Sequence, residues 1–285
     1  MRRDLTRIDA HHHLWRYNDR DYVWMSDQMS VLRRDFLVPE LELVLAQSGI
    51  GGAVSVQARQ TLAETRWLLE LARTAEIIRG VVGWVPLVQS DLRESLEEFA
   101  GDPKLKGVRH VVHDEPDDDY MLRDDFNRGI ALLKDYGLVY DILIFERHLP
   151  QTLAFVDRHP NQIFVVDHIA KPRIRDRALS PWRELLRELA RRENVYCKVS
   201  GMVTEAGWNA WTPADLAPYF EVVLSAFGPK RLMFGSDWPV LNLAADYARW
   251  VEIVGHWLAA LSEQERSRIW GETAVEAYRL DPKRS

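Results

Sequence analysis

The chain alternates short β-rich runs with amphipathic helical patterns over almost its whole length. Runs rich in strand-forming residues occur at residues 7–13, 52–57, 80–85, 107–112, 138–144, 163–168, 195–200 and 232–237. Helical spacing of apolar residues follows at 61–75, 91–99, 126–136, 149–158, 182–192, 214–227 and 246–261. Strands that alternate with helices predict a parallel sheet. Eight such units in 285 residues predict a closed (β/α)8 TIM barrel of the α/β class.

The segments between these elements favour a single domain over residues 1–285. Gly49, Gly137 and Gly228 fall where a helix would end before the next strand, a position that favours glycine. No linker, low-complexity tract or short repeat interrupts the pattern. Residues 17–35 are polar, aromatic and irregular, and we predict that they form a long loop over the barrel mouth. A second long loop is expected at 203–213.

Composition excludes several classes of function. The net charge of −6 does not suggest a nucleic-acid-binding face. No apolar run approaches the roughly 18–20 residues that span a bilayer, and no stretch of signal-peptide length follows Met1. Cys197 is the single cysteine, so no internal disulfide can form, and we interpret it as a packing residue. We therefore expect a cytoplasmic protein with no membrane or nucleic-acid partner.

Polar and ionisable side chains gather at the predicted carboxyl ends of the strands. In chain order they are His11 and His13, Gln57, Trp84, Arg109 and His110, Asp141, Asp167 and His168, Lys198 and Ser200, and Ser236 and Asp237. Ionisable groups in a barrel interior are costly unless they face a solvated pocket or pair with one another. Because the active site of such a barrel lies at this end, the pattern predicts an active site there.

The first strand carries the clearest signal, Asp9-Ala10-His11-His12-His13. Alternate side chains of an extended strand point the same way, so His11 and His13 should project together, with Asp9 on their side and His12 opposite. Two adjacent imidazoles make a site for a metal or for an electrophile. An expression tag is a poorer interpretation, because the run lies between Ile-Asp and Leu-Trp.

Other strand ends supply further candidates. Asp237 follows an apolar strand in Phe-Gly-Ser-Asp-Trp-Pro, and His168 ends another in Val-Val-Asp-His. Arg109 can clamp a carboxylate or carbonyl, or serve in a structural ion pair. Glu146 can bind sugar hydroxyls or lie in a solvated loop. The acidic run at 114–119 fits a solvated loop better than a metal site.

Three motifs carry a resemblance to a known family. Asp-Ala-His-His-His-Leu-Trp, Asp-His-Ile-Ala-Lys-Pro and Phe-Gly-Ser-Asp-Trp-Pro resemble the amidohydrolase superfamily, in particular the sugar-lactonase subgroup of its amidohydrolase-2 branch. The resemblance runs from about residue 8 to about residue 280. It implies hydrolysis of an aldonolactone, L-fuconolactone or a close relative, to the free sugar acid. Many members of the superfamily that the chain resembles complete a two-metal site with a carboxylated lysine on the fourth strand and a histidine on the fifth. Here the fourth strand offers Arg109 and His110 and the fifth offers Asp141, so a binuclear metal centre is not expected.

The resemblance also implies roles for individual residues. Asp237 would act as general base on water, while His11 and His13, with Arg109, would polarise the lactone carbonyl. His168 would bind the carbonyl or ring oxygen and help to protonate the leaving alkoxide. The substrate-binding set is expected to be Arg109, His110, Gln57, Trp84, Glu146 and Lys198. No cofactor is expected to be obligatory, although one Zn²⁺ could be held by His11, His13, His168 and Asp237.

Two other functions remain open at this level. A metal-dependent decarboxylase or lyase acting on an aromatic or unsaturated acid could use the same barrel. A non-catalytic barrel that binds sugar acids is disfavoured by the presence of a base candidate beside its histidine partners. The sequence leaves open the exact lactone, the metal requirement and the oligomeric state.

Overall fold

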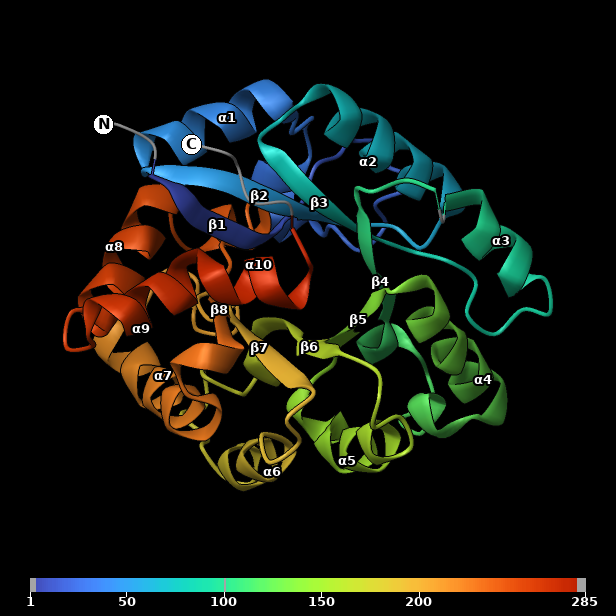
Figure 1. Ribbon diagram of the computed structural model, residues 1–285. Coiled ribbons are helices and arrows are strands. Elements are labelled where there is room, and N and C mark those ends of the chain that lie inside the picture. Colours follow the sequence, from blue (N-terminus) through green and yellow to red (C-terminus); the bar gives the residue numbers. More distant parts are fainter. Residues whose placement is uncertain (1–3, 100, 281–285) are drawn as a thin grey trace.

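The computed structural model describes residues 4–99 and 101–280 and contains one eight-stranded parallel sheet (Figure 1). Its strands follow the chain order as β1 (Asp4–His12), β2 (Ile50–Val56), β3 (Ile78–Gly83), β4 (Leu105–Val111), β5 (Val139–Leu143), β6 (Phe164–Val166), β7 (Val195–Val199) and β8 (Leu232–Phe234). The Asp237 amide donates to the His11 carbonyl (2.8 Å) and the His13 amide to the Trp238 carbonyl (2.7 Å). These bonds join the last strand to the first, so the predicted (β/α)8 barrel is confirmed.

Helices α1 to α9 surround the sheet, and α10 lies over one end of the barrel (Figure 1). They are α1 (Val38–Gln47), α2 (Leu62–Thr74), α3 (Leu92–Phe99), α4 (Asp124–Leu133), α5 (Leu149–Asp157), α6 (Trp182–Leu189), α7 (Pro213–Phe227), α8 (Tyr247–Leu258), α9 (Glu263–Ser267) and α10 (Thr273–Ala277). The sequence patterns predicted α2 to α8 but not α1, which buries only Leu41 and Leu45 and directly follows an irregular segment. No helix in the described part of the chain is both long and apolar enough to cross a membrane.

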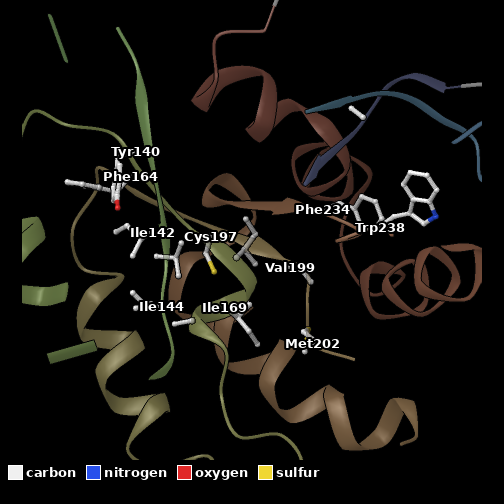
Figure 2. Close-up of a cluster of buried hydrophobic side chains, with 14 of the residues drawn as sticks. Tyr140, Ile142, Ile144, Phe164, Ile169, Cys197, Val199, Met202, Phe234 and Trp238 are labelled. Carbon is white, nitrogen blue, oxygen red and sulfur yellow. The ribbon is translucent and has the colours of Figure 1, made fainter. Parts of the chain in front are cut away.

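Alternation along the strands separates the outer core from the barrel interior. On β5, Tyr140 and Ile142 lie in the outer core between sheet and helices, where Tyr140 packs against Phe155 of α5 (Figure 2). Cys197 and Val199 of β7 lie in the same core, so the expectation that Cys197 is a packing residue is confirmed. The residues between them in sequence, Asp141 and Lys198, therefore face the opposite side, which is the inside of the barrel.

The end of the barrel opposite the carboxyl ends of the strands, here called the lower end, is filled by apolar side chains. Members of this interior cluster include Ile8, Val54, Val82 and Val139, and α10 adds Tyr278 at its end (Figure 1). Branched side chains of this kind pack the interior of a (β/α)8 TIM barrel into a solid core rather than a pore. The ionisable side chains are thus confined to the opposite end.

Residues 17–35 connect the end of β1 to α1 and contain the 3₁₀ helix η1 (Asp27–Leu32). Trp15 and Phe36 form an antiparallel bridge at the base of this loop, and Tyr22, Met25 and Leu32 are buried beneath it. Trp24 remains 38% exposed. The loop is therefore fixed at its base by buried apolar side chains while one indole reaches the surface.

Candidate active site

A cavity of about 270 Å³ opens at the carboxyl ends of the strands. Its buried ionisable residues are His13, Arg109, His168 and Asp237. The rest of its wall consists of Trp15, Trp24, Ala58, Val111, His113, Asp114, Leu143, Lys171 and Val240. These four side chains are buried and have little water around them, so their charge interactions are stronger than at the surface.

Three imidazoles surround one oxygen of Asp237. Its Oδ1 lies 3.3 Å from His13 Nε2, 3.7 Å from His11 Nε2 and 3.8 Å from His168 Nε2. The Nε2 atoms of His11 and His13 are 3.2 Å apart. The structure therefore brings together the four residues that the sequence analysis placed at the centre of the site.

Hydrogen bonds on the far side of each ring set its orientation. His13 Nδ1 donates to the Val56 carbonyl (2.8 Å), which turns its Nε2 toward Asp237. His168 Nδ1 lies 2.9 Å from Ser200 Oγ, and His11 Nδ1 lies 3.3 Å from Asp167 Oδ1. Each ring is thus held through Nδ1 with Nε2 directed toward Asp237, an arrangement common among metal-binding and catalytic histidines.

Unusual backbone conformations position His168 and Asp237. The residues His168 to Lys171 all have positive φ, between 44° and 61°, and Asp237 has φ 61°. This left-handed conformation costs about 1–2 kcal/mol per residue for L-amino acids. The Trp182 indole donates to the Ile169 carbonyl (2.8 Å) and helps to hold the turn. Strained backbone of this kind is typical of functional sites.

Asp9 does not join the histidines, contrary to the expectation from simple alternation. Between Asp9 and His12, β1 advances three residues while β2 advances two, so a bulge changes which side chains share a face. The Asp9 carboxylate instead accepts bonds from Ser236 N (2.8 Å), Ser236 Oγ (2.6 Å) and the Tyr247 hydroxyl (3.0 Å). It fixes the turn that precedes Asp237. His12 points away from the site, as expected, and contacts Ser55.

A buried charge network lies behind His11. Lys198 Nζ lies 2.5 Å from Asp141 Oδ2, 2.9 Å from Asp167 Oδ1 and 3.1 Å from His11 Nδ1. Tyr278 donates its hydroxyl to Asp141, 2.8 Å from either oxygen. Burial raises the pKa of Asp141 to about 6 despite the neighbouring Lys198 ammonium. Lys198 is fully buried among these partners and holds the network together.

The central groups carry different charges at neutral pH. Burial lowers the pKa of His168 to about 4, although Asp237 and Asp167 act in the opposite direction, so the imidazole is neutral. Burial alone would raise the pKa of Asp237, but His168, His13 and His11 outweigh it and hold the pKa below its usual value. Asp237 is therefore an ionised proton acceptor beside the neutral His168.

The predicted substrate-binding residues divide into two groups. Arg109 lines the cavity, with its Nη1 3.0 Å from Asp167 Oδ2 and 3.3 Å from His11 Nε2. Gln57 lies behind Arg109, where its Oε1 accepts a bond from Nη2 (3.1 Å), and Lys198 is enclosed in the network described above. Neither Gln57 nor Lys198 lines the cavity.

The other three lie outside the cavity as well. Trp84 donates its indole N–H to His110 (3.3 Å), and His110 contacts Glu115 (2.6 Å) and stacks on Tyr120. His110 follows Arg109 on β4 and so points to the other side of the strand. Glu146 pairs with Arg173 (2.6 Å) and borders a different cavity.

Three ionisable cavity residues and one indole from the mouth loop were not predicted as site residues. Trp24 comes from the loop predicted to cover the mouth, and Lys171 belongs to the Asp-His-Ile-Ala-Lys-Pro motif. His113 and Asp114 follow β4, and Asp114 begins the acidic run that was interpreted as a solvated loop. Their positions just beyond strand ends were the available signal, but nothing in the sequence shows which loop side chains turn inward.

Three of the four predicted donors, His11, His13 and Asp237, lie close enough together to bind one metal ion, whereas His168 groups with His11 and Asp167 instead. Three imidazole nitrogens and one carboxylate oxygen are ligands that Zn²⁺ binds tetrahedrally, with donor atoms about 3.3–3.4 Å apart. The distances from His11 to His13 (3.2 Å) and from His13 to Asp237 (3.3 Å) fit this spacing. Arg109 and Lys198 are both close to His11 and oppose the binding of a dication. His11, His13 and Asp237 therefore fit one ion, but the neighbouring cations oppose its binding.

Comparison with known proteins places the chain among characterised enzymes. The family model described as Amidohydrolase matches residues 8–280. The chain is 45% identical to an L-fucono-1,5-lactonase of Burkholderia multivorans over 96% of both proteins, and 38% identical to an L-fucono-1,5-lactonase of Burkholderia ambifaria, again over 96% of both. A crystal structure of an amidohydrolase from Burkholderia multivorans with bound zinc superposes with a TM-score of 0.94 at 44% identity, covering 96% of this chain and 99% of that one. The chain therefore belongs to the amidohydrolase family.

Proposed function

We propose that this enzyme hydrolyses a sugar lactone, L-fucono-1,5-lactone or a close relative, to the open sugar acid. The observation that carries the proposal is the placement of Asp237 Oδ1 within 3.8 Å of three imidazole Nε2 atoms inside a cavity. An ionised carboxylate at such a point can take a proton from water beside a bound ester carbonyl. Relatives that match 96% of the chain and are named for this activity support the choice of lactone.

In this mechanism Asp237 removes a proton from water as the water oxygen attacks the lactone carbonyl. Arg109, which is always charged, and His11 and His13 bind the oxygen on which negative charge develops. The bond from the carbonyl carbon to the ring oxygen then breaks. His168 binds the carbonyl or ring oxygen, and its Nε2 lies 3.8 Å from Asp237 Oδ1. In this proposal the proton taken from water returns through His168 to the departing alkoxide.

The same residues would hold a divalent ion. A Zn²⁺ bound by His11, His13, His168 and Asp237 would act as a Lewis acid that polarises the lactone carbonyl. Arg109 already supplies a fixed positive charge beside His11 (3.3 Å). We therefore propose that a metal is not obligatory.

The decarboxylase alternative has less support. It would act on an aromatic or unsaturated acid in the same barrel and release CO₂. Two relatives that cover 96% of this chain are named L-fucono-1,5-lactonases. No feature of the cavity favours an aromatic acid over a sugar lactone.

The deciding experiment is a pH-indicator assay of acid release from a panel of aldonolactones that begins with L-fucono-1,5-lactone. The enzyme is assayed as purified and after exhaustive chelation. We expect acid release at equal rates in both states. Loss of rate on chelation and recovery with Zn²⁺ would make the metal obligatory. No acid from any lactone would contradict the proposal, and CO₂ release from an aromatic acid would establish the alternative.

A further inference from the structure

The cavity has two chemically different walls. Strand β1 lies across the barrel from β5, as the ring of strands in Figure 1 shows. Trp15 and Trp24 come from the segment that follows β1. His113 follows β4 and Lys171 follows β6, so both come from the two neighbours of β5. An aromatic wall therefore faces a wall that carries an imidazole and an ammonium group.

His113 borders this cavity and carries an unpaired hydrogen-bond acceptor within the described part of the chain. Its ring stacks on Phe145 with centroids 4.6 Å apart, and its Nε2 lies 3.4 Å from Asp114 Oδ1. Burial, followed by the charge of Lys171, lowers the pKa of His113 to about 2, so the ring is neutral. With Nε2–H directed to Asp114, Nδ1 is an acceptor. That Nδ1 is buried and makes no hydrogen bond within residues 4–99 and 101–280.

Lys171 lies on the same wall and borders both this cavity and the neighbouring one, which Glu205 and Phe145 line. Its Nζ lies 3.3 Å from Glu205 Oε1 and 5.5 Å from the centre of the Phe145 ring, on which His113 also stacks. An ammonium group has three N–H donors, and the pair with Glu205 occupies one of them. The left-handed backbone at Lys171, φ 44°, is part of the turn that also positions His168. The location of Lys171 is therefore tied to that of the reaction centre.

The opposite wall suits the apolar face of a sugar ring. Trp15 is fully buried and packs edge to face with Trp24, with ring centroids 6.1 Å apart. Trp24 is partly exposed and lines the cavity. An indole presents a large apolar surface at little conformational cost. A ligand with C–H groups on one face and hydroxyl groups on the other matches both walls.

We propose that His113 and Lys171 bind hydroxyl groups of the lactone substrate and so select polyhydroxylated lactones over unsubstituted ones, with Trp24 covering the opposite face of the ring. This inference rests on the proposed lactonase function. A hydroxyl group both donates and accepts, so it can donate to His113 Nδ1 or accept from Lys171 Nζ. Neither residue is among the groups around Asp237, so both act on binding and specificity rather than on bond breaking.

The test compares two lactones that share the reacting ester. L-fucono-1,5-lactone carries ring hydroxyls, and δ-valerolactone carries none. The variants Lys171→Met and His113→Phe remove the polar atoms and keep similar shapes. We expect each to lower kcat/KM for the sugar lactone about 10- to 100-fold, mainly through KM, because the hydroxyl groups lose a partner. The value for δ-valerolactone should change by less than about twofold.

Arg147→Met is the matched control. Arg147 also places a cation over the Phe145 ring (5.0 Å), but it borders the neighbouring cavity, so both lactones should react as before. Equal losses on the two lactones, or no loss on the sugar lactone, would overturn the inference and leave the lactonase function standing. Wild-type enzyme that releases acid from neither lactone would overturn both. Thermal melts check folding, and Lys171→Met alone decides the outcome if His113→Phe does not fold.

Discussion

The two ends of the barrel interior contain opposite kinds of side chains. The lower end is closed by α10 and filled with residues such as Val54, Val82 and Tyr278. The upper end holds the imidazoles around Asp237, the Lys198 network and a run of left-handed backbone. Apolar packing stabilises the fold without directional requirements, whereas buried charges are stable only when each has its partners. Stability and chemistry are therefore assigned to different ends of the same strands.

The Lys198 network connects the two ends. Tyr278 belongs to the apolar cluster by its ring, yet its hydroxyl reaches Asp141 (2.8 Å), which pairs with Lys198 behind His11. A substitution that acts only on the chemistry should leave stability unchanged, and one within the network should change it strongly. The following variants test this division.

Asp237→Asn should give the largest effect on activity. The amide cannot take a proton from water, so kcat should fall by about 10²- to 10⁴-fold. Thermal unfolding should stay close to that of the wild type, because the shape of the side chain is kept. Steady-state acid release measures the rate. Asp176→Asn is the control, since that carboxylate is exposed and lies outside the cavity. Retained turnover in Asp237→Asn would exclude this residue as the base.

Lys198→Met should give the largest effect on stability. Its loss would leave the buried carboxylates of Asp141 and Asp167 without their shared cation, at a cost of about 3–5 kcal/mol in the free energy of unfolding. Urea unfolding provides the measurement. Arg183→Met removes an exposed pair with Glu184 and should cost about 0–1 kcal/mol. Similar losses in the two variants would show that the network does not stabilise the upper end.

Gly201→Ala should affect both properties moderately. A Cβ at this position would lie 2.5 Å from His168 Nδ1, and the backbone φ is +63°. Strain should cost about 1–2 kcal/mol, and displacement of His168 should lower kcat/KM by about 10- to 100-fold.

Gly228→Ala separates these two effects. It has the same φ of +63° but no atom within 4 Å of the added Cβ, so it should lose stability and keep its activity. If Gly201→Ala reacted as fast as Gly228→Ala, the position of His168 would not matter for turnover.

Glu64→Gln should give the smallest effect, visible as a change with pH. Burial raises the pKa of Glu64 from 4.5 to about 7, against the backbone N–H groups of Arg59 and Ala58. Because the folded state binds this proton more tightly, the contribution of Glu64 is complete below pH 4.5 and is lost as pH rises through about 7. Between pH 5 and pH 8, the free energy of unfolding of the wild type should fall by about 1–2 kcal/mol relative to that of the variant. Urea unfolding at both values tests this, and a constant difference would contradict it.

Much of this structure follows from sequence pattern, with local exceptions. The eight strands, α2 to α8 and the convergence of His11, His13, His168 and Asp237 could be predicted, because strand-end residues of a parallel barrel meet at one end. His110 and Glu146 also lie at or just after the end of a strand, yet both are outside the cavity. A strand-end position therefore does not reveal the direction of the side chain. Asp9 shows the same limit, since one bulge reverses the face on which it lies.

The sequence by itself determined the fold class and the chemistry at the barrel's upper end. Both depend on local features, namely the periodicity of apolar residues and the residue types that follow each strand. The tertiary structure decided which of those residues meet in the cavity, that Lys198 and Gln57 support the site from behind, and that Trp24, His113 and Lys171 form its walls. These contacts join distant segments, and they depend on barrel closure, on a bulge and on left-handed turns, which no local pattern specifies.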